Sequence, residues 1–284
     1  MFFRTKRSCL RLETIIKHIV CYSGGHSSAL VAIEVFRMYG KDGLVLLNHD
    51  IHKSVEDYDI KRFKWVVADY LGVPITFANM PAVEKKDQFD VVVEAGAFKV
   101  GNGTALCTNR LKTRPFEDWL KQNCAEKESC VIYYGFDKTE HRRIQRRASH
   151  LATLGFKTDF PLAFWNRTIY STTEIGIPPP LTYSIWKHAN CLGCLKAGRQ
   201  HWYCVYCLRP DLWERGKWAE DEIDYTIIKG ASLEELEPLF ERMKKAGIQP
   251  TEKIPAATFW KQVRDRLAVS IEEIEQEKPC ECSS

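Results

Sequence analysis

The chain has 284 residues, of which 45% are hydrophobic and 27% are charged, with a formal net charge of +4. This length fits one large domain or two smaller ones, and the apolar content excludes an intrinsically disordered protein. No apolar run approaches the about 18 residues that a membrane span needs, and none follows the basic N-terminal residues as a signal sequence would. We therefore expect a soluble, cytoplasmic protein with no membrane partner.

Cysteine is the most informative residue type. The chain contains 11 cysteines, an odd number, without a secretory signal. A disulfide scaffold is a poor explanation for such a chain, and metal binding or thiol chemistry is a better one.

The first half of the chain alternates between strand and helix patterns. Strands are predicted over residues 15–22, 43–48, 75–78 and 131–136, and helices over residues 27–39, 55–72 and from about Pro115. This β-α-β-α-β order is typical of a parallel sheet covered on both faces. The predicted fold class is therefore α/β, a doubly wound parallel sheet.

Beyond about residue 165 the pattern changes. Three prolines at positions 178–180 interrupt the chain, a Cys-rich stretch follows, and helices are predicted over residues 232–246 and 255–277. We therefore divide the chain into a nucleotide-binding α/β domain, residues 1–165, and a smaller, mostly helical Cys-rich region, residues 166–284.

A small-residue loop connects the first predicted strand to the first helix. Two glycines let the backbone approach an anion, the helix N-terminus behind them offers N–H groups, and the serines add hydroxyls. These residues are Ser23, Gly24, Gly25, His26, Ser27 and Ser28. The loop predicts a phosphate site, and the alternative is an ordinary Gly-rich turn.

The SGG-x-x-S loop resembles the pyrophosphate loop of the adenine-nucleotide α-hydrolase superfamily. Further motifs resemble its phosphoadenosine phosphosulfate reductase-like branch. In chain order they are Cys107-Thr108 with Leu111-Lys112 and Pro115, Gly135-Phe136-Asp137 with Glu140 and Arg143, Phe160-Pro161-Leu162, Gly176-Ile177-Pro178, and Asn190-Cys191-Leu192-Gly193-Cys194. The resemblance extends from residue 23 to about residue 215.

The resemblance implies a bound adenine nucleotide, either ATP or adenosine phosphosulfate. Residues 23–28, Lys112, Glu140 and Arg143 would bind it, with Arg143 also catalytic as a substrate contact. Many relatives carry Asp at the position of Ser27, where it helps to hold Mg²⁺, so ATP cleavage is in question for this chain.

Asp50 follows the second predicted strand, at the edge of the sheet where α/β proteins bind ligands. It is the second candidate catalytic residue, since it could supply the missing carboxylate for Mg²⁺. The alternative is that Asp50 caps a turn.

Two cysteine pairs have the spacing C-x2-C-x9-C-x2-C, and they are Cys191 with Cys194 and Cys204 with Cys207. This spacing suits a four-thiolate zinc site. The resemblance implies a different site, in which Cys107 joins Cys191 and Cys194 to hold a 4Fe–4S cluster, either with an open iron or with Cys204 or Cys207 as the fourth ligand. Thiolates suit both metals, so both interpretations stay open.

Two further segments have a functional and an ordinary interpretation. Cys280 and Cys282 could act as a C-terminal nucleophile, as in sulfonucleotide reductases, or lie in a disordered tail. A basic segment, residues 138–147, could bind a nucleic acid or form a solvated helix face. Its basic residues are Lys138, His141, Arg142, Arg143, Arg146 and Arg147.

The leading hypothesis is an enzyme of sulfur metabolism that binds an adenine nucleotide. It would carry out sulfonucleotide reduction or ATP-dependent sulfur transfer, the thiolation of a nucleobase or nucleic acid, with a sulfur- or electron-donor protein as a possible partner. The alternative is a non-catalytic regulator that binds a nucleotide or nucleic acid and carries a structural zinc knuckle.

Overall fold

The computed structural model describes residues 15–81, 85–101, 103–189 and 191–268. Its centre is a five-stranded sheet in which every pair of neighbouring strands is parallel. The strands are β1 (Lys17–Cys21), β2 (Leu44–Asn48), β3 (Ile75–Phe77), β4 (Cys130–Tyr133) and β5 (Lys157–Asp159). The predicted α/β class with a parallel sheet is confirmed.

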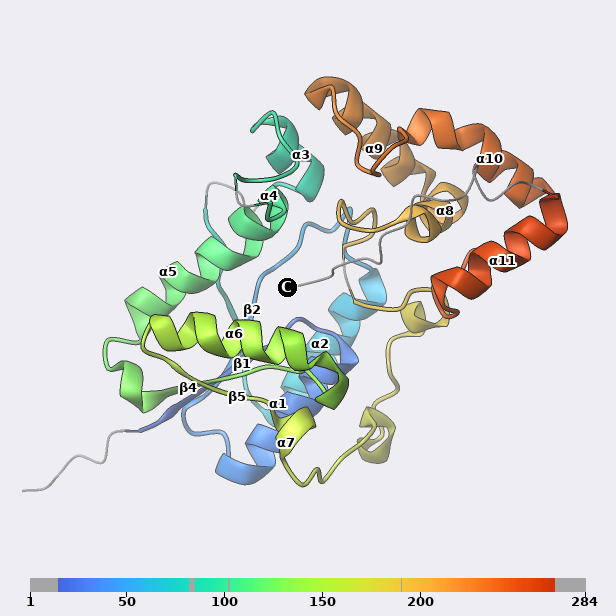
Figure 1. Ribbon diagram of the computed structural model, residues 1–284. Coiled ribbons are helices and arrows are strands. Elements are labelled where there is room, and N and C mark those ends of the chain that lie inside the picture. The colour runs from blue at the N-terminus through green and yellow to red at the C-terminus, as the bar shows by residue number, and fades with distance from the viewer. Residues whose placement is uncertain (1–14, 82–84, 102, 190, 269–284) are drawn as a thin grey trace, which may run out of the picture.

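Helices cover both faces of the sheet (Figure 1). Helices α1 (His26–Tyr39) and α2 (Tyr58–Leu71) pack on one face, and α5 (Arg114–Asn123) and α6 (His141–Thr153) pack on the other. Neighbouring strand residues supply both cores, because successive side chains of a strand point to opposite faces. Val20 belongs to the core with α1 and α2, and Ile19 belongs to the core with α5 and α6.

The strand order is β3-β2-β1-β4-β5. The chain therefore builds the sheet outward from β1 on one side and then returns to add β4 and β5 on the other. The carboxyl ends of β1 and β4 diverge into loops that lead to opposite faces of the sheet. This is the topological switch point, where open α/β sheets bind their ligands.

A third hydrophobic core lies outside the sheet. It contains α8 (Arg199–Leu208), α9 (Pro210–Ile223), α10 (Leu233–Lys245) and α11 (Ala256–Leu267), which lie together at one side of Figure 1. The shorter helices α3 (Gln88–Val93) and α4 (Leu106–Thr108) also belong to this core.

The packing crosses the predicted domain boundary at residue 165 in both directions. Phe89 and Leu106 pack in the helical core, although they precede the boundary, while Ile169 and Ile177 pack in the core of α1 and α2, although they follow it. The division into residues 1–165 and 166–284 stays a prediction, and the cores themselves interleave along the chain.

Most of the predicted elements are present with small shifts at their ends. The predicted helix over residues 232–246 is α10, and the predicted helix from residue 255 is present as α11 as far as Leu267. The patterns did not predict β5, α8 or α9. The rest of the last predicted helix and the tail with Cys280 and Cys282 lie outside the described residues. In the described ranges, every helix is too short or too polar to cross a membrane.

A buried ion pair lies beneath the loop that follows β1. Lys64 on α2 is 1% exposed, and its Nζ donates to Oε1 of Glu56 at 2.9 Å and to Oε2 at 3.1 Å. The Lys64 side chain also packs 3.2 Å from the place where a Cβ on Gly24 would stand. Because two charges are buried together, each one depends on the other for compensation.

We expect Lys64→Met to lower the free energy of unfolding by about 2–4 kcal/mol, because Glu56 would be left as a poorly compensated buried charge. Lys61, which is about a quarter exposed and lies 3.3 Å from the same carboxylate, provides the matched control. Lys61→Met should cost about 1 kcal/mol or less. Urea unfolding measures both variants, and equal losses would contradict a structural role specific to Lys64.

Candidate functional site

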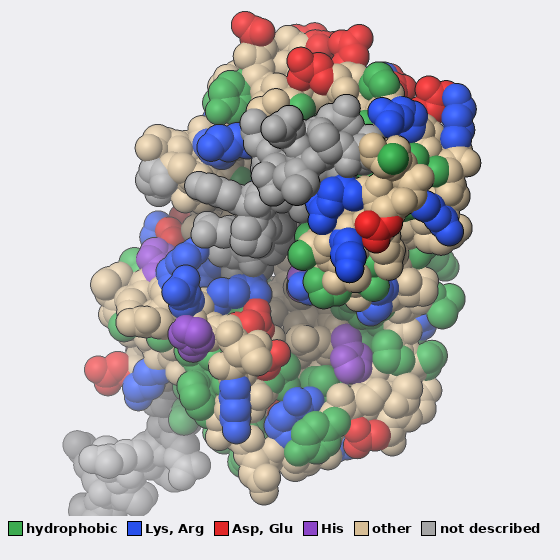
Figure 2. All heavy atoms as spheres, turned by 45° about the vertical axis from the view of Figure 1, so that its right-hand side comes forward, with side chains coloured by type: hydrophobic (Ala, Val, Ile, Leu, Met, Phe, Trp, Pro, Cys, Tyr) green, Lys and Arg blue, Asp and Glu red, His purple; other side chains and the backbone are tan. Residues whose placement is uncertain are grey.

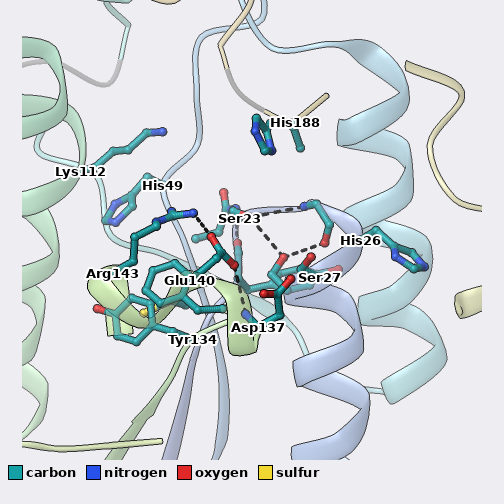
Figure 3. A pocket seen from close by; sticks show the side chains of 18 of the residues that line it. Ser23, His26, Ser27, His49, Lys112, Tyr134, Asp137, Glu140, Arg143 and His188 are labelled. Carbon is teal, nitrogen blue, oxygen red and sulfur yellow. Dashed lines mark hydrogen bonds and ion pairs between the residues drawn. The ribbon is translucent and has the colours of Figure 1, made fainter. Parts of the chain in front are cut away.

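A cavity of about 760 Å³ opens at the switch point (Figure 3). The loops that follow β1, β2 and β4 line its floor, together with the start of α5 and the π-helical turn η1 (Asn109–Thr113) that precedes it. On the side of the helical core, the cavity is lined by Pro179, Tyr183, Lys187, His188, Ala189 and Lys253. The cavity is therefore built by both parts of the molecule.

The predicted phosphate loop forms one wall of this cavity. Gly24 has a φ of +83°, a conformation that favours glycine, and Gly25 is the N-cap of α1. The Ser28 hydroxyl donates to the carbonyl oxygen of Gly25 at 2.8 Å, and the Ser23 hydroxyl donates to Ser28 Oγ at 3.2 Å. Ser23 and Ser27 are exposed to the cavity, while Ser28 is buried and shapes the loop.

The loop after β4 contacts this phosphate loop directly. A Cβ added at Gly135 would stand 3.1 Å from the backbone carbon of Ser27 and 3.2 Å from the backbone nitrogen of Ser28. The absence of a side chain at Gly135 thus allows the two loops to meet at the switch point.

Glu140 and Arg143, both predicted to bind nucleotide, line the cavity together. Glu140 forms a capping box with Asp137, and its other carboxylate oxygen accepts from Arg143 (Figure 3). The guanidinium of Arg143 also lies 4.3 Å from the centre of the Phe136 ring. The ion pair and the ring fix the direction of Arg143, so its charge is held at the cavity.

The predicted basic face divides into two. Arg143 and Arg147 line the cavity, and Arg147 lies 5.4 Å from the Tyr134 ring centre. The remaining basic residues of this segment are exposed to solvent, and they are Lys138, His141, Arg142 and Arg146. A nucleic-acid partner on this outer face stays a prediction.

The cavity is predominantly basic. Among the described residues that line it, five carry a Lys or Arg side chain and two carry a carboxylate. Figure 2 shows Lys, Arg and His side chains around the hollow of this face. The basic residues are Lys112, Arg143, Arg147, Lys187 and Lys253, and the acidic residues are Asp137 and Glu140. This excess of positive charge favours an anionic ligand.

Asp50, the second predicted catalytic residue, is not among the described residues that line the cavity. Its side chain is 55% exposed and pairs with Lys61 Nζ at 2.9 Å. Its backbone N–H donates to Asn79 Oδ1 at 2.8 Å. The structure therefore places Asp50 in the loop after β2, outside the described cavity lining, and a catalytic role for it stays a prediction.

His49, in contrast, lines the cavity beside Lys112 (Figure 3). Its Nδ1 lies 2.8 Å from the carbonyl oxygen of Ala78. The pKa of His49 is lowered to about 4, chiefly by burial and also by the charge of Lys112, while the bond to Ala78 acts in the opposite direction. A neutral ring that donates from Nδ1 to a carbonyl leaves Nε2 as a hydrogen-bond acceptor.

The lowered pKa of His49 predicts a loss of stability in acid. Between pH 6.5 and 4, His49 is protonated in the unfolded chain but stays neutral in the folded protein. The free energy of unfolding therefore falls as the pH falls through this window. His49→Asn keeps an N–H for Ala78 and should reduce this loss by about 1–3 kcal/mol. Urea unfolding across this pH range measures the effect, with the exposed His141→Asn as control. A pH slope unchanged by His49→Asn would contradict the assignment.

The five cysteines that are candidate metal ligands fall into two groups. Cys107, Cys191 and Cys194 are free thiols, and all three are electrostatic neighbours of Lys112. Burial lowers the pKa of Lys112, but the three thiols and Glu56 raise it more, so it lies above its ordinary value. Lys112 thus stays protonated, and it interacts with the thiols while it lines the cavity.

Cys204 and Cys207 lie on α8 rather than in the loop that carries Cys191. Cys204 is fully buried, and burial raises its pKa well above its ordinary value, with Glu252 and Cys207 as further causes. Within the described ranges, no group of three or more His, Cys, Asp or Glu side chains has the geometry to hold a metal ion. Both metal predictions stay predictions.

A hydrogen-bonded pair connects the thiol loop to the cavity wall. His201 Nε2 accepts the Cys194 N–H at 3.1 Å, and His201 Nδ1 lies 2.7 Å from Glu252 Oε1. Glu252 Oε2 accepts the N–H of Lys187, a cavity residue, at 3.1 Å. Sequence patterns did not reveal this pair, because His201 and Glu252 are 51 positions apart.

His26 of the phosphate loop binds the C-terminal half through both its backbone and its side chain. The backbone N–H of His26 donates to Tyr183 Oη at 3.0 Å, and His26 Nε2 accepts the N–H of Thr172 at 3.2 Å. The His26 ring points away from the cavity (Figure 3), so His26 contributes its backbone to the site. Tyr183 is a cavity residue that the sequence analysis missed.

Comparison with known proteins gives no further guide. No protein-family model, no curated protein and no solved structure matches the chain.

Proposed function

We propose that this chain is an adenine-nucleotide-binding enzyme of sulfur chemistry, of the phosphoadenosine phosphosulfate reductase-like type. One observation carries the proposal: Lys112 lines the basic cavity and is at the same time the electrostatic neighbour of Cys107, Cys191 and Cys194. Lys112 would therefore connect a ligand in the cavity to this group of thiols, which are not themselves among the described residues that line it. This arrangement suits transfer of sulfur to, or its reduction on, a bound anion.

The cavity supplies the binding part of this function. The N-terminus of α1 and the glycines before it favour a phosphate group. Arg143, held by Glu140 and Phe136, would bind a second anionic group and stabilise negative charge that develops during the reaction. His49 Nε2 would accept a hydrogen bond from the ligand.

The three thiols of this group are the candidate ligands of an iron–sulfur cluster, as the family resemblance implies. Thiolates suit such a cluster, and they suit zinc as well. Cys107, Cys191 and Cys194 would hold the cluster, which when bound would supply an iron that polarises a sulfur-containing group. Lys112 would lower the energy of the thiolate charges beside it.

Two reactions remain candidates within this class. In reduction, a thiolate attacks the sulfur of adenosine phosphosulfate and releases the adenosine phosphate, and a second thiol then releases sulfite as a disulfide forms. In sulfur transfer, ATP adenylates a substrate oxygen with loss of pyrophosphate, and sulfide then displaces AMP. Sulfite release and pyrophosphate release distinguish the two.

A nucleotide-binding regulator is the second candidate function. Ser27 stands where many relatives of the resembled family have a carboxylate, and the two carboxylates lining the cavity, Asp137 and Glu140, already bind backbone N–H groups. A magnesium ion for ATP cleavage would therefore lack an obvious protein ligand among the described residues. Nucleotide binding without any sulfite or pyrophosphate release would favour the regulator.

We expect Arg143→Met to weaken binding of AMP or adenosine phosphosulfate by about 10- to 100-fold, because it removes a charged hydrogen-bond donor from the cavity. Arg142→Met is the matched control, since Arg142 is the exposed neighbour on the same helix. Titration calorimetry measures both affinities. Equal affinities for the two variants would contradict the cavity as the nucleotide site.

The thiols are tested by anaerobic purification with iron, zinc and acid-labile sulfide analysis. We expect a brown protein with about four irons and four sulfides per chain, whose colour is lost in Cys107→Ser and Cys191→Ser. Cys207→Ser is the control and should keep the colour. A colourless protein with one zinc, lost in Cys204→Ser and retained in Cys107→Ser, would overturn the cluster and support the zinc knuckle.

A further inference from the structure

Residues 177–189, here called the strap, cross the opening of the phosphate loop. Tyr183 of the strap places its Oη 3.0 Å from the backbone nitrogen of His26, which donates to it. The same Oη lies 3.0 Å from the position that a Cβ on Gly25 would take, and the Ala189 side chain lies 3.1 Å from it. The strap thus packs directly against Gly25, where a larger side chain would leave no room for it.

The Tyr183 hydroxyl can donate a hydrogen bond to a ligand. Burial raises the pKa of Tyr183 more than the bond from His26 lowers it, so the phenol is protonated at neutral pH. Its oxygen already accepts the His26 N–H, and the described residues provide no acceptor for its own proton. Because Tyr183 lines the cavity, this proton is available to a ligand there.

Hydrogen bonds on both sides of Tyr183 anchor the strap to the rest of the protein. On one side, the N–H of Ile177 donates to the carbonyl oxygen of Thr172 at 3.0 Å, and the N–H of Leu181 donates to Asp59 Oδ2 at 2.5 Å. On the other side, the carbonyl of Ile185 accepts the N–H of Glu252 at 2.8 Å. A donor fixed in this way costs little ordering when a ligand binds.

We propose that Tyr183 is a phosphate-binding residue, which accepts the first helical N–H of α1 and donates its own hydroxyl proton to a phosphate oxygen in the cavity. The strap thereby makes the helical part of the chain a component of the anion site. This assignment rests on the proposed nucleotide-binding function and adds to it a residue from outside the α/β sheet and its covering helices.

The test compares Tyr183→Phe with wild type by calorimetry, with pyrophosphate and AMP as ligands. Loss of one donor to a charged group predicts binding weaker by about tenfold or more, and Tyr225→Phe, an exposed tyrosine outside the cavity lining, should bind as wild type does. Unchanged or tighter binding by Tyr183→Phe would overturn the assignment, the latter by making Tyr183 a competitor of the phosphate. Absence of binding by wild type would overturn the nucleotide-binding function and, with it, the assignment.

Hydrogen exchange of the wild-type protein provides a second measurement, which does not depend on the folding of a variant. If Tyr183 stays and donates, pyrophosphate should slow amide exchange in peptides that cover residues 177–189. Faster exchange of the strap with pyrophosphate bound would mean that the ligand displaces Tyr183, and would overturn the proposal.

Discussion

The contact between the loops after β1 and β4 is the constraint on which the site depends. These strands are neighbours in the sheet, but their loops lead to opposite faces, so the two loops are close only where the strands end. Because Gly135 has no Cβ, its backbone can lie close to the backbone of Ser27 and Ser28. On one side of this contact lies the N-terminus of α1, and on the other lies Arg143, so a single ligand can reach both.

The site is completed from outside the sheet. The strap contributes Tyr183 and Lys187, the turn before α11 contributes Lys253, and the thiol loop lies next to Lys112. Glu252 connects these parts, since its carboxylate binds both the strap and His201, and His201 binds the backbone of Cys194. The strap and the thiol loop are therefore connected by hydrogen bonds that meet at Glu252.

The sequence predicted the parts of the structure whose residue patterns are local. The alternation of apolar strands and amphipathic helices up to β4 is strong, and the glycines of residues 23–28 indicate their own turn. In contrast, β5 has three residues, Lys157–Asp159, without an apolar pattern, and it forms because Tyr133 and Ile132 offer it an edge.

The parts that could not be predicted depend on contacts between distant segments. Tyr183 meets His26 across 157 positions, and no local pattern encodes that meeting. Spacing alone also could not show that Cys107, which is 84 positions before Cys191 in the sequence, packs against the same core as Cys191 and interacts with it electrostatically. The basic segment was visible in the sequence, but only the packing of α6 separates Arg143 and Arg147 from their exposed neighbours.

The interleaving of the cores has a consequence for how the chain acquires its structure. Phe89, Val91 and Leu106 belong to a core whose remaining members extend to Val263, more than 150 positions later. During synthesis on the ribosome, at about 5–20 residues per second, the apolar side of α3 emerges well before its partners. At this rate that surface lacks its partners from α8 to α11 for about 5–35 seconds, and such exposed apolar surface is prone to aggregation.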